Sequence, residues 1–435
     1  MRSSRLLAAS LVGVVASGLA VSTVVPASAA SAPTSGSATS AAHTAQTALP
    51  LSASSNPAAG RTLTLPAPQG RFATGESQFR LVDDKRQDTW DPAKPYRELM
   101  ISVFYPAVRT GGKPFTKQFP PEAAAAIGAA AEQNFELPAG LVDWAATTTH
   151  SVRDATMAPG RFPVILYSPG AGSARDLNVT LVENLASRGY IVVTIDHTGE
   201  APATEFPDGH IVGNATVNAA FAQAYKDGTT LAFFTKLMTA READTEVVLD
   251  RLPTLPGRLS QGMDLNRIGM FGHSAGGFTA ANLMYTDPRI KAGADMDGTL
   301  EYTVEPDGTN LSQVALHGLK QPFLLIGSAG QGAGNIHSEP SWTSFWNHRR
   351  GWTADVTLND SLHLSLTDFE ALLPQLAGKV PASTLASHLG TVDPHRAVAA
   401  DRALIDSFFD RFLKGCDDHL LDGRGASQYP ITFEK

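Results

Sequence analysis

The sequence predicts an α/β protein in which a mostly parallel β-sheet is covered by helices on both faces. Three observations lead to this prediction. Several apolar runs are too short for helices and are apolar on both faces, which is typical of strands buried inside a parallel sheet. Segments of helical length separate these runs. Proline and glycine end the runs where the chain must turn, as Pro169 and Gly170 do.

The expected elements alternate from about residue 62 onward. The strands are apolar runs at residues 97–106, 163–168, 190–196, 267–271, 322–327 and 354–358. The helices show apolar residues at helical spacing, at residues 176–188, 241–252 and 278–285. Two segments interrupt this alternation, residues 115–149 and 201–231. Either they form lids over a pocket or they are peripheral additions.

The first 60 residues differ in composition from the rest. They carry only two charged side chains, Arg2 and Arg5, which precede a long apolar stretch and a small-residue cleavage pattern. Residues 1–30 are therefore predicted to be a secretory signal peptide rather than a transmembrane anchor. Residues 31–60 are almost entirely Ala, Ser, Thr, Pro and Gly and predict a disordered linker. Residues 61–435 remain as one folded domain, expected to be secreted and monomeric, without stable membrane insertion after cleavage.

Composition excludes several classes of function. The net charge is −8 and no block of basic residues occurs, which argues against nucleic-acid binding. A single cysteine, Cys416, rules out an internal disulfide framework and a cysteine zinc cluster, and we expect it to be a surface thiol. The sequence contains no His-Glu-x-x-His motif, and we expect neither a metal ion nor a cofactor.

The strongest chemical signal is the run Gly272-His273-Ser274-Ala275-Gly276 between a predicted strand and a predicted helix. This strand-turn-helix setting is the nucleophile elbow, in which strained backbone exposes a serine hydroxyl and small neighbours let strand and helix pass closely. We therefore predict Ser274 as a nucleophile. His273 is predicted to be a packed histidine, because its side chain points away from its neighbour.

A serine nucleophile needs two backbone N–H groups to hold the oxyanion that develops on the substrate. Ala275, directly after the nucleophile, is expected to supply one. The loop after residues 163–168 contains Ala171 between two glycines, and Ala171 is expected to supply the other. A dinucleotide-binding turn is an alternative for this loop, but the third glycine of that pattern is absent. A plain turn is a second alternative.

The acid and the base are expected in the order serine, acid, histidine. Asp297 and Asp295 both follow the next predicted strand, and Asp297 is preferred because it lies nearer the strand's C-terminal end. His363 is preferred as the base because it follows the strand-like residues 354–358. The other later histidines are His317, His337, His348, His388, His395 and His419.

Several of these motifs together resemble the platelet-activating factor acetylhydrolase-like esterases of the plasma type, within the α/β-hydrolase superfamily. The motifs are residues 97–106 ending in Tyr-Pro, Ser-Pro-Gly-Ala-Gly, Gly-His-Ser-Ala-Gly-Gly, Leu-His-Leu-Ser-Leu-Thr-Asp-Phe, residues 406–410, and a late Tyr-Pro. The resemblance covers about residues 70–433. It implies the α/β-hydrolase fold, the roles given above to Ser274, Asp297, His363, Ala171 and Ala275, and no cofactor. The loop around Ala171 departs from the family's His-Gly-Leu-Gly pattern, which leaves acyl-pocket size and substrate open.

The function that follows is a secreted serine carboxylesterase that forms an acyl-enzyme on a small-molecule or lipid ester. A lipase or polyester hydrolase with the same residues is an alternative, favoured if an aromatic groove lies open. Trp342, Trp346 and Trp352 are candidates for such a groove and equally for packing. A non-catalytic binding module on the same fold is a third hypothesis, against which the order of the three residue types argues.

Overall fold

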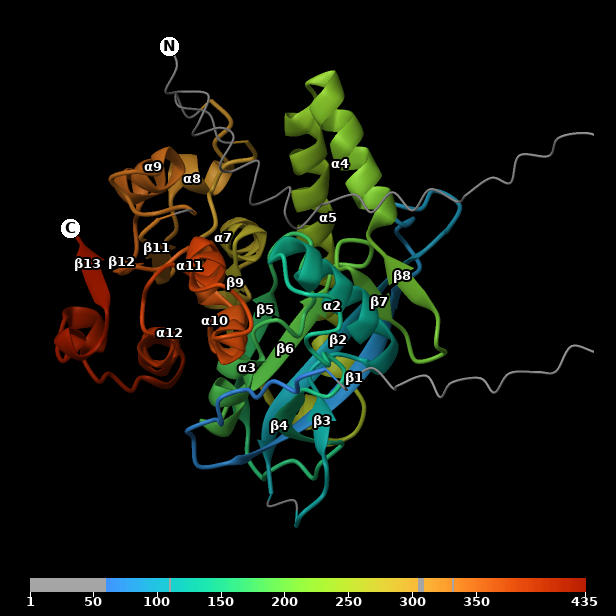
Figure 1. Ribbon diagram of the computed structural model, residues 1–435. Helices are drawn as coiled ribbons and strands as arrows, with labels where there is room; N and C mark the ends of the chain where they lie inside the picture. The colour runs from blue at the N-terminus through green and yellow to red at the C-terminus, as the bar shows by residue number, and fades with distance from the viewer. Residues whose placement is uncertain (1–59, 109–110, 304–308, 331) are drawn as a thin grey trace, which may run out of the picture.

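The computed structural model describes residues 60–108, 111–303, 309–330 and 332–435. Its centre is an 11-stranded sheet in the order β13-β12-β11-β10-β9-β5-β6-β2-β1-β4-β3 (Figure 1). Neighbouring strands run parallel from β6 across to β12. These strands are β5 (Phe162–Ser168), β6 (Ile191–Asp196), β9 (Met263–His273), β10 (Ile290–Met296), β11 (Phe323–Ser328) and β12 (Thr353–Leu358). The predicted mostly parallel sheet is confirmed.

Antiparallel strands extend both edges of this parallel core. β2 (Arg97–Ala107) pairs antiparallel with β6 and with β1 (Ala73–Asp83). Beyond β1, β4 (Thr148–Arg153) pairs parallel with β1, and β3 (Phe115–Lys117) pairs antiparallel with β4. At the opposite edge β13 (Ile431–Glu434) pairs antiparallel with β12. The sequence analysis missed β1, β3, β4 and β13.

Helices cover both faces of the sheet. Six of them match or extend the alternation with strands: α3 (Val179–Ser187), α5 (Thr230–Arg251), α7 (Ala275–Thr286), α8 (Gln313–His317), α9 (Pro340–His348) and α12 (Pro394–Phe409). Three further helices are α6 (Arg258–Gly262), α10 (Phe369–Leu372) and α11 (Ala382–Leu389). Along β11, Leu324 and Ile326 enter one core cluster with α3 and α12, whereas Phe323 and Leu325 enter another with α7 and α9. This alternation explains why both faces of the predicted strands are apolar.

The two interrupting segments behave differently. Residues 115–149 form β3, α2 (Pro121–Asn134) and the start of β4, and α2 packs into the core that contains α3. Residues 201–231 form a hairpin of β7 (Ala203–Glu205) and β8 (Ile211–Gly213), then α4 (Ala215–Asp227). α4 packs on α5 through a separate apolar cluster, and the two helices rise together from the body of the molecule (Figure 1).

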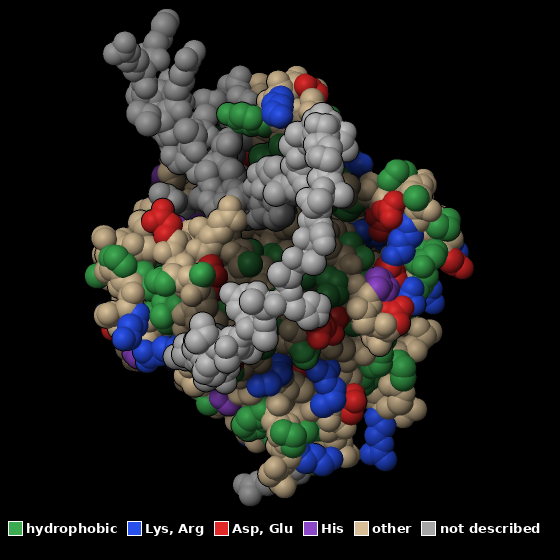
Figure 2. All heavy atoms as spheres, turned by 45° about the vertical axis from the view of Figure 1, so that its right-hand side comes forward, with side chains coloured by type: hydrophobic (Ala, Val, Ile, Leu, Met, Phe, Trp, Pro, Cys, Tyr) green, Lys and Arg blue, Asp and Glu red, His purple; other side chains and the backbone are tan. Residues whose placement is uncertain are grey.

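The predicted signal peptide, residues 1–30, and nearly all of the predicted linker, residues 31–60, lie outside the described residues. No helix in the described part of the chain is both long and apolar enough to cross a membrane. Cys416 is exposed, as expected. Basic and acidic side chains are intermixed along the right-hand side of the face shown in Figure 2.

Candidate active site

Ser274 lies at a sharp turn between β9 and α7. Its backbone has φ 55° and ψ −125°, a conformation that residues other than glycine rarely adopt. Such strained backbone is found mostly at functional sites. Close packing maintains the turn, since a Cβ added at Gly276 would lie 1.9 Å from the carbonyl oxygen of Ser168. The Ser274 amide also donates to Met296 O on β10 at 2.8 Å. The turn therefore presents a half-buried serine at the carboxyl end of the sheet.

Asp297 and His363 are in direct contact. His363 Nδ1 lies 2.7 Å from Asp297 Oδ2, and both residues are buried. The other carboxylate oxygen, Oδ1, accepts from the amides of Ser328 at 2.9 Å and Ala333 at 3.0 Å, and the Ser328 hydroxyl donates to Oδ2 at 2.9 Å. These donors fix the carboxylate so that it can orient the His363 ring.

Asp295 occupies a different environment. Its Oδ1 accepts from the Gly298 amide at 2.8 Å, and its side chain is buried away from His363. Burial raises the pKa of Asp295 well above its usual range. Of the two candidate acids, the structure brings only Asp297 to the histidine.

Gly332 limits the space beside Asp297. Its φ is 145°, and a Cβ there would lie 1.7 Å from Asp297 Oδ2. We expect Gly332→Ala to displace the carboxylate and lower kcat by about 100-fold, because misplacement of a catalytic group by roughly 1 Å has an effect of that size. The matched control is Gly378→Ala, which has a φ of 79° but open space around it and should leave kcat unchanged. Equal kcat values for the two variants would contradict this account.

Ser274 and His363 line the same cavity, which has a volume of about 520 Å³. Within the described residues no hydrogen bond joins the Ser274 hydroxyl to His363. Catalytic hydrogen bonds are often long before substrate binds and tighten in the complex. The cavity walls come from the loop after β5, from α2 and the residues that flank it, from residues 362–364 (the His363 segment), from α10 and from α11. They include Phe119, Ile127, Ala130, Phe135, Ala171, Leu177, Phe369, Ser387 and His388.

The predicted oxyanion donors flank Ser274. Ala171 lines the cavity, and Ala275 is the first residue of α7. Neither amide donates a hydrogen bond to any acceptor in the described part of the chain. Unpaired amides at a helix start and in a turn are suited to receive an anionic oxygen.

His273 packs against the His363 ring and hydrogen-bonds to the His363 backbone. Its Nε2 lies 2.9 Å from the His363 carbonyl oxygen, and the two rings are 4.4 Å apart. Because a carbonyl only accepts, Nε2 carries the proton. Burial, together with neighbouring His363, lowers the pKa of His273 well below its usual range, so His273 stays neutral. Its place matches the predicted packed histidine.

Loss of this donor should loosen the His363 segment. We expect His273→Phe to lower kcat about fivefold relative to His273→Gln, whose amide nitrogen replaces Nε2 as a donor, because one hydrogen bond contributes roughly 1 kcal/mol. The measurement is kcat of both variants for 4-nitrophenyl acetate, each assayed at the same number of degrees below its own Tm. Identical kcat values in the two variants would show that the bond does not position His363.

The remaining candidates lie elsewhere. Of the later histidines, only His388 joins His363 at the cavity wall, where its ring meets Phe135 edge-on at 5.0 Å. The tryptophans are packing residues: Trp342 is fully buried and donates to Gly298 O, Trp346 packs against the core cluster of α7 and α9, and Trp352 packs on Phe408. The sequence analysis did not identify α11, His388, the two phenylalanines that flank α2 or Phe369 of α10 as cavity walls, since no local motif marks them.

One side-chain cluster of the described chain has metal-ligand chemistry. Ligand atoms of Asp417, His419 and Asp422 lie within 4.8 Å of one another near the C-terminal end. Arg411 forms ion pairs with Asp417 at 3.3 Å and with Asp422 at 2.9 Å. A cation of the protein itself therefore already balances the cluster, which lies apart from the cavity.

Comparisons with known proteins agree with this geometry. The family model "Platelet-activating factor acetylhydrolase, isoform II" matches residues 62–219. A probable 1-alkyl-2-acetylglycerophosphocholine esterase of Arthroderma benhamiae is 28% identical over 84% of this chain and 92% of its own length. The solved structure of a ferulic acid esterase from Streptomyces cinnamoneus is 31% identical, with a TM-score of 0.69, over 86% of this chain and 99% of that one.

This chain belongs to the platelet-activating factor acetylhydrolase-like esterases of the α/β-hydrolase superfamily. The platelet-activating factor acetylhydrolase of Gallus gallus is a more distant relative, 23% identical over 63% of this chain and 69% of its own length. The acetylhydrolase-like protein is accordingly a serine ester hydrolase. The predicted family, fold and enzyme class are confirmed.

Proposed function

We propose that this protein is an exported serine carboxylesterase that uses Ser274, His363 and Asp297 to form an acyl-enzyme. The observation that supports this most is the 2.7 Å contact between Asp297 and His363 beside a cavity that Ser274 also lines. A strained serine, an oriented imidazole and unpaired amides are the parts that acyl transfer requires.

In the proposed mechanism, His363 Nε2 accepts the proton of the Ser274 hydroxyl while Ser274 Oγ attacks the ester carbonyl carbon. The carbonyl π electrons move to oxygen, which the Ala171 and Ala275 amides stabilise. Collapse of this intermediate breaks the bond to the alkoxy oxygen, which takes the proton from His363 and leaves as the alcohol. Water then releases the acid with His363 in the same roles.

The size of the cavity favours an ester with a compact acyl group as the substrate. Its volume of about 520 Å³ is typical of small-molecule sites, and α2 and α11 contribute to its walls. The aromatic residues Phe119, Phe135 and Phe369 line this cavity together with Ser387 and His388, which add a hydroxyl and an imidazole group. Relatives named for acetyl and ferulic acid esters are consistent with a short or planar acyl group. A lipase or polyester hydrolase would need an open groove instead.

Cavity size can be tested on α2. Ala130 lines the cavity and its neighbour Ala129 is exposed. We expect Ala130→Phe to reduce kcat/KM for a hexanoyl ester about tenfold more than for the acetyl ester, because the ring occupies acyl space. Ala129→Phe is the matched control and should change neither. An equal effect on both esters in Ala130→Phe would place the acyl group elsewhere.

The functional assignment is tested by a substrate profile of the purified enzyme. The panel contains 4-nitrophenyl esters from acetyl to dodecanoyl, methyl ferulate, an oxidised phospholipid and a polyester film. A maximum at short or aromatic acyl groups supports the proposal. A maximum at long chains or on the film favours the lipase or polyester alternative, and no turnover on the panel contradicts the esterase proposal.

Export is proposed from the sequence of residues 1–30. We expect a bacterial host that recognises the signal to release protein with a mature N-terminus close to residue 30. Terminal sequencing of the released protein measures this. Retention of residues 1–30 on the recovered protein would contradict it.

A further inference from the structure

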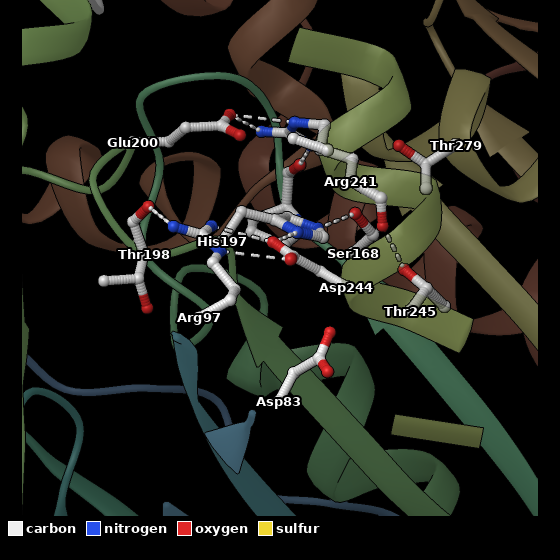
Figure 3. Close-up of polar contacts among 12 residues, drawn as sticks. Asp83, Arg97, Ser168, His197, Thr198, Glu200, Arg241, Asp244, Thr245 and Thr279 are labelled. Carbon is white, nitrogen blue, oxygen red and sulfur yellow. Dashed lines mark hydrogen bonds and ion pairs between the residues drawn. The ribbon is translucent and has the colours of Figure 1, made fainter. Parts of the chain in front are cut away.

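A buried polar network (Figure 3) contacts the loop that carries Ala171 through hydrogen bonds to Pro169 O and Gly170 O. We call residues 169–172 the oxyanion loop. The network includes two arginines, Arg97 of β2 and Arg241 of α5, both with no solvent-exposed surface. Arg97 pairs with Asp244 at 2.8 Å, whereas Arg241 extends to the oxyanion loop.

Arg241 holds this loop by its backbone. Nη1 donates to Pro169 O at 2.7 Å, and Nη2 donates to Gly170 O at 3.1 Å. Glu200 fixes the other edge of the guanidinium, accepting from Nε at 2.8 Å and from Nη2 at 2.6 Å. The planar guanidinium therefore contacts two consecutive carbonyl groups and one carboxylate, an arrangement that a lysine ammonium cannot reproduce.

Gly170 O and the Ala171 N–H belong to the same peptide unit. In a trans peptide the C=O and N–H bonds point in opposite directions, so the direction of one sets the direction of the other. Arg241 holds Gly170 O inside the protein, and the Ala171 N–H then faces the cavity that Ala171 lines. If this peptide flipped, a carbonyl oxygen would face the developing oxyanion and repel it.

A second contact acts on the same oxygen. The Ser173 amide donates to Gly170 O at 3.1 Å and closes the turn. The guanidinium adds a charged donor, and charge-assisted hydrogen bonds are roughly twice as strong as neutral ones. A cation on the carbonyl oxygen also withdraws electron density from the amide, which makes the Ala171 N–H a better donor.

The base of the loop is anchored by the same network. The Ser168 hydroxyl lies 2.9 Å from His197 Nε2, and His197 Nδ1 lies 3.2 Å from Asp244. Buried ion pairs by themselves contribute little to stability, and apolar replacements are often as stable. The contact of the buried Arg241–Glu200 pair with the oxyanion loop is therefore better explained by a role in orienting that loop.

We propose that Arg241, braced by Glu200, is a positioning residue that fixes the Gly170–Ala171 peptide with its N–H directed at the oxyanion. This proposal rests on the proposed function of Ser274. It assigns to a residue of α5, outside every local motif, a role in stabilising the transition state rather than in binding the ester.

The test compares the double variant Arg241→Met/Glu200→Gln, in which neither a carboxylate nor a guanidinium stays buried without its partner, with the unmodified parent enzyme. We expect kcat for 4-nitrophenyl acetate to fall about 10- to 100-fold with KM within threefold, since the interaction acts on the oxyanion. A trifluoromethyl ketone, which forms a tetrahedral adduct with a serine nucleophile, should bind more weakly by a similar factor.

Arg402 provides the matched control. It is also a buried arginine that donates to two consecutive carbonyl oxygens, of Pro66 at 2.9 Å and Ala67 at 3.0 Å, away from the cavity. Arg402→Met should lower Tm to a comparable degree but leave kcat and ketone affinity within twofold. Equal losses of kcat in the Arg402 and Arg241 variants would overturn the proposal, as would a folded Arg241→Met variant with the parent's kcat.

Arg241→Lys covers the case in which the methionine variant does not fold. A lysine keeps the positive charge but lacks the planar set of N–H donors that contacts both carbonyl groups. We therefore expect kcat and the affinity for the ketone each to fall five- to tenfold. Parental kcat in this variant would overturn the proposal. Fluorophosphonate labelling of the parent enzyme distinguishes failure of the proposed function from failure of the positioning role. Absence of a Ser274 adduct contradicts the proposed function. A Ser274 adduct in the parent, together with parental kcat in the Arg241 variants, contradicts only the positioning role.

Discussion

Ser274→Ala is expected to lower kcat for 4-nitrophenyl acetate by about 10⁴-fold or more. The substitution removes the only atom proposed to form the acyl-enzyme, while the oxyanion donors and the cavity remain to give a small residual rate. Tm should change little, because alanine occupies the same turn without new contacts. The measurement is kcat beside a thermal melt, on protein purified free of host esterases.

Ser387 supplies the control for this substitution. It lies on α11 and lines the same cavity. Ser387→Ala removes an equivalent hydroxyl from the cavity wall and should retain kcat within about threefold. If Ser274→Ala kept more than a tenth of the parent's kcat, Ser274 would not be the nucleophile.

Asp297→Asn is expected to lower kcat by about 10⁴-fold. Asparagine keeps the shape of the side chain, but its amide group can donate to His363 Nδ1, which moves the ring proton to Nε2 and removes the general base. The contact at 2.7 Å makes this tautomer effect direct. Single-turnover kinetics with the same nitrophenyl ester measure the loss in the acylation step.

Asp295→Asn is the paired control. Burial raises the pKa of Asp295 well above its usual range, which favours the neutral acid that asparagine resembles, and the Gly298 amide retains an acceptor. We expect kcat within about threefold of the parent. The opposite result, with Asp295→Asn inactive and Asp297→Asn active, would exchange the roles of the two carboxylates.

Local motifs carried much of the sequence prediction. The elbow around Ser274 needs only a strand, small neighbours and a helix, all of which lie within residues 263–286. The parallel strands were recognisable because burial on both faces makes them continuously apolar. The antiparallel strand β1 was missed, since its partly exposed residues lack such a run.

The sequence favours Asp297 over Asp295, but the contacts that decide between them are tertiary. Ser328, at the end of β11, and Ala333, in the loop after it, donate to the Asp297 carboxylate. Likewise, α2 and α11 reach the cavity, and Arg241 reaches the oxyanion loop, only through tertiary packing. Such contacts join segments far apart in the chain, and no spacing or periodicity records them.

The most direct test of the central claim is covalent labelling of the purified enzyme with a fluorophosphonate, followed by mass measurement of the intact protein and of its proteolytic peptides. We expect one adduct per chain, located on Ser274, with complete and parallel loss of esterase activity. Ser274→Ala should remain unlabelled under the same conditions. An adduct on another residue that abolishes activity, or full activity after Ser274 is labelled, would contradict the account.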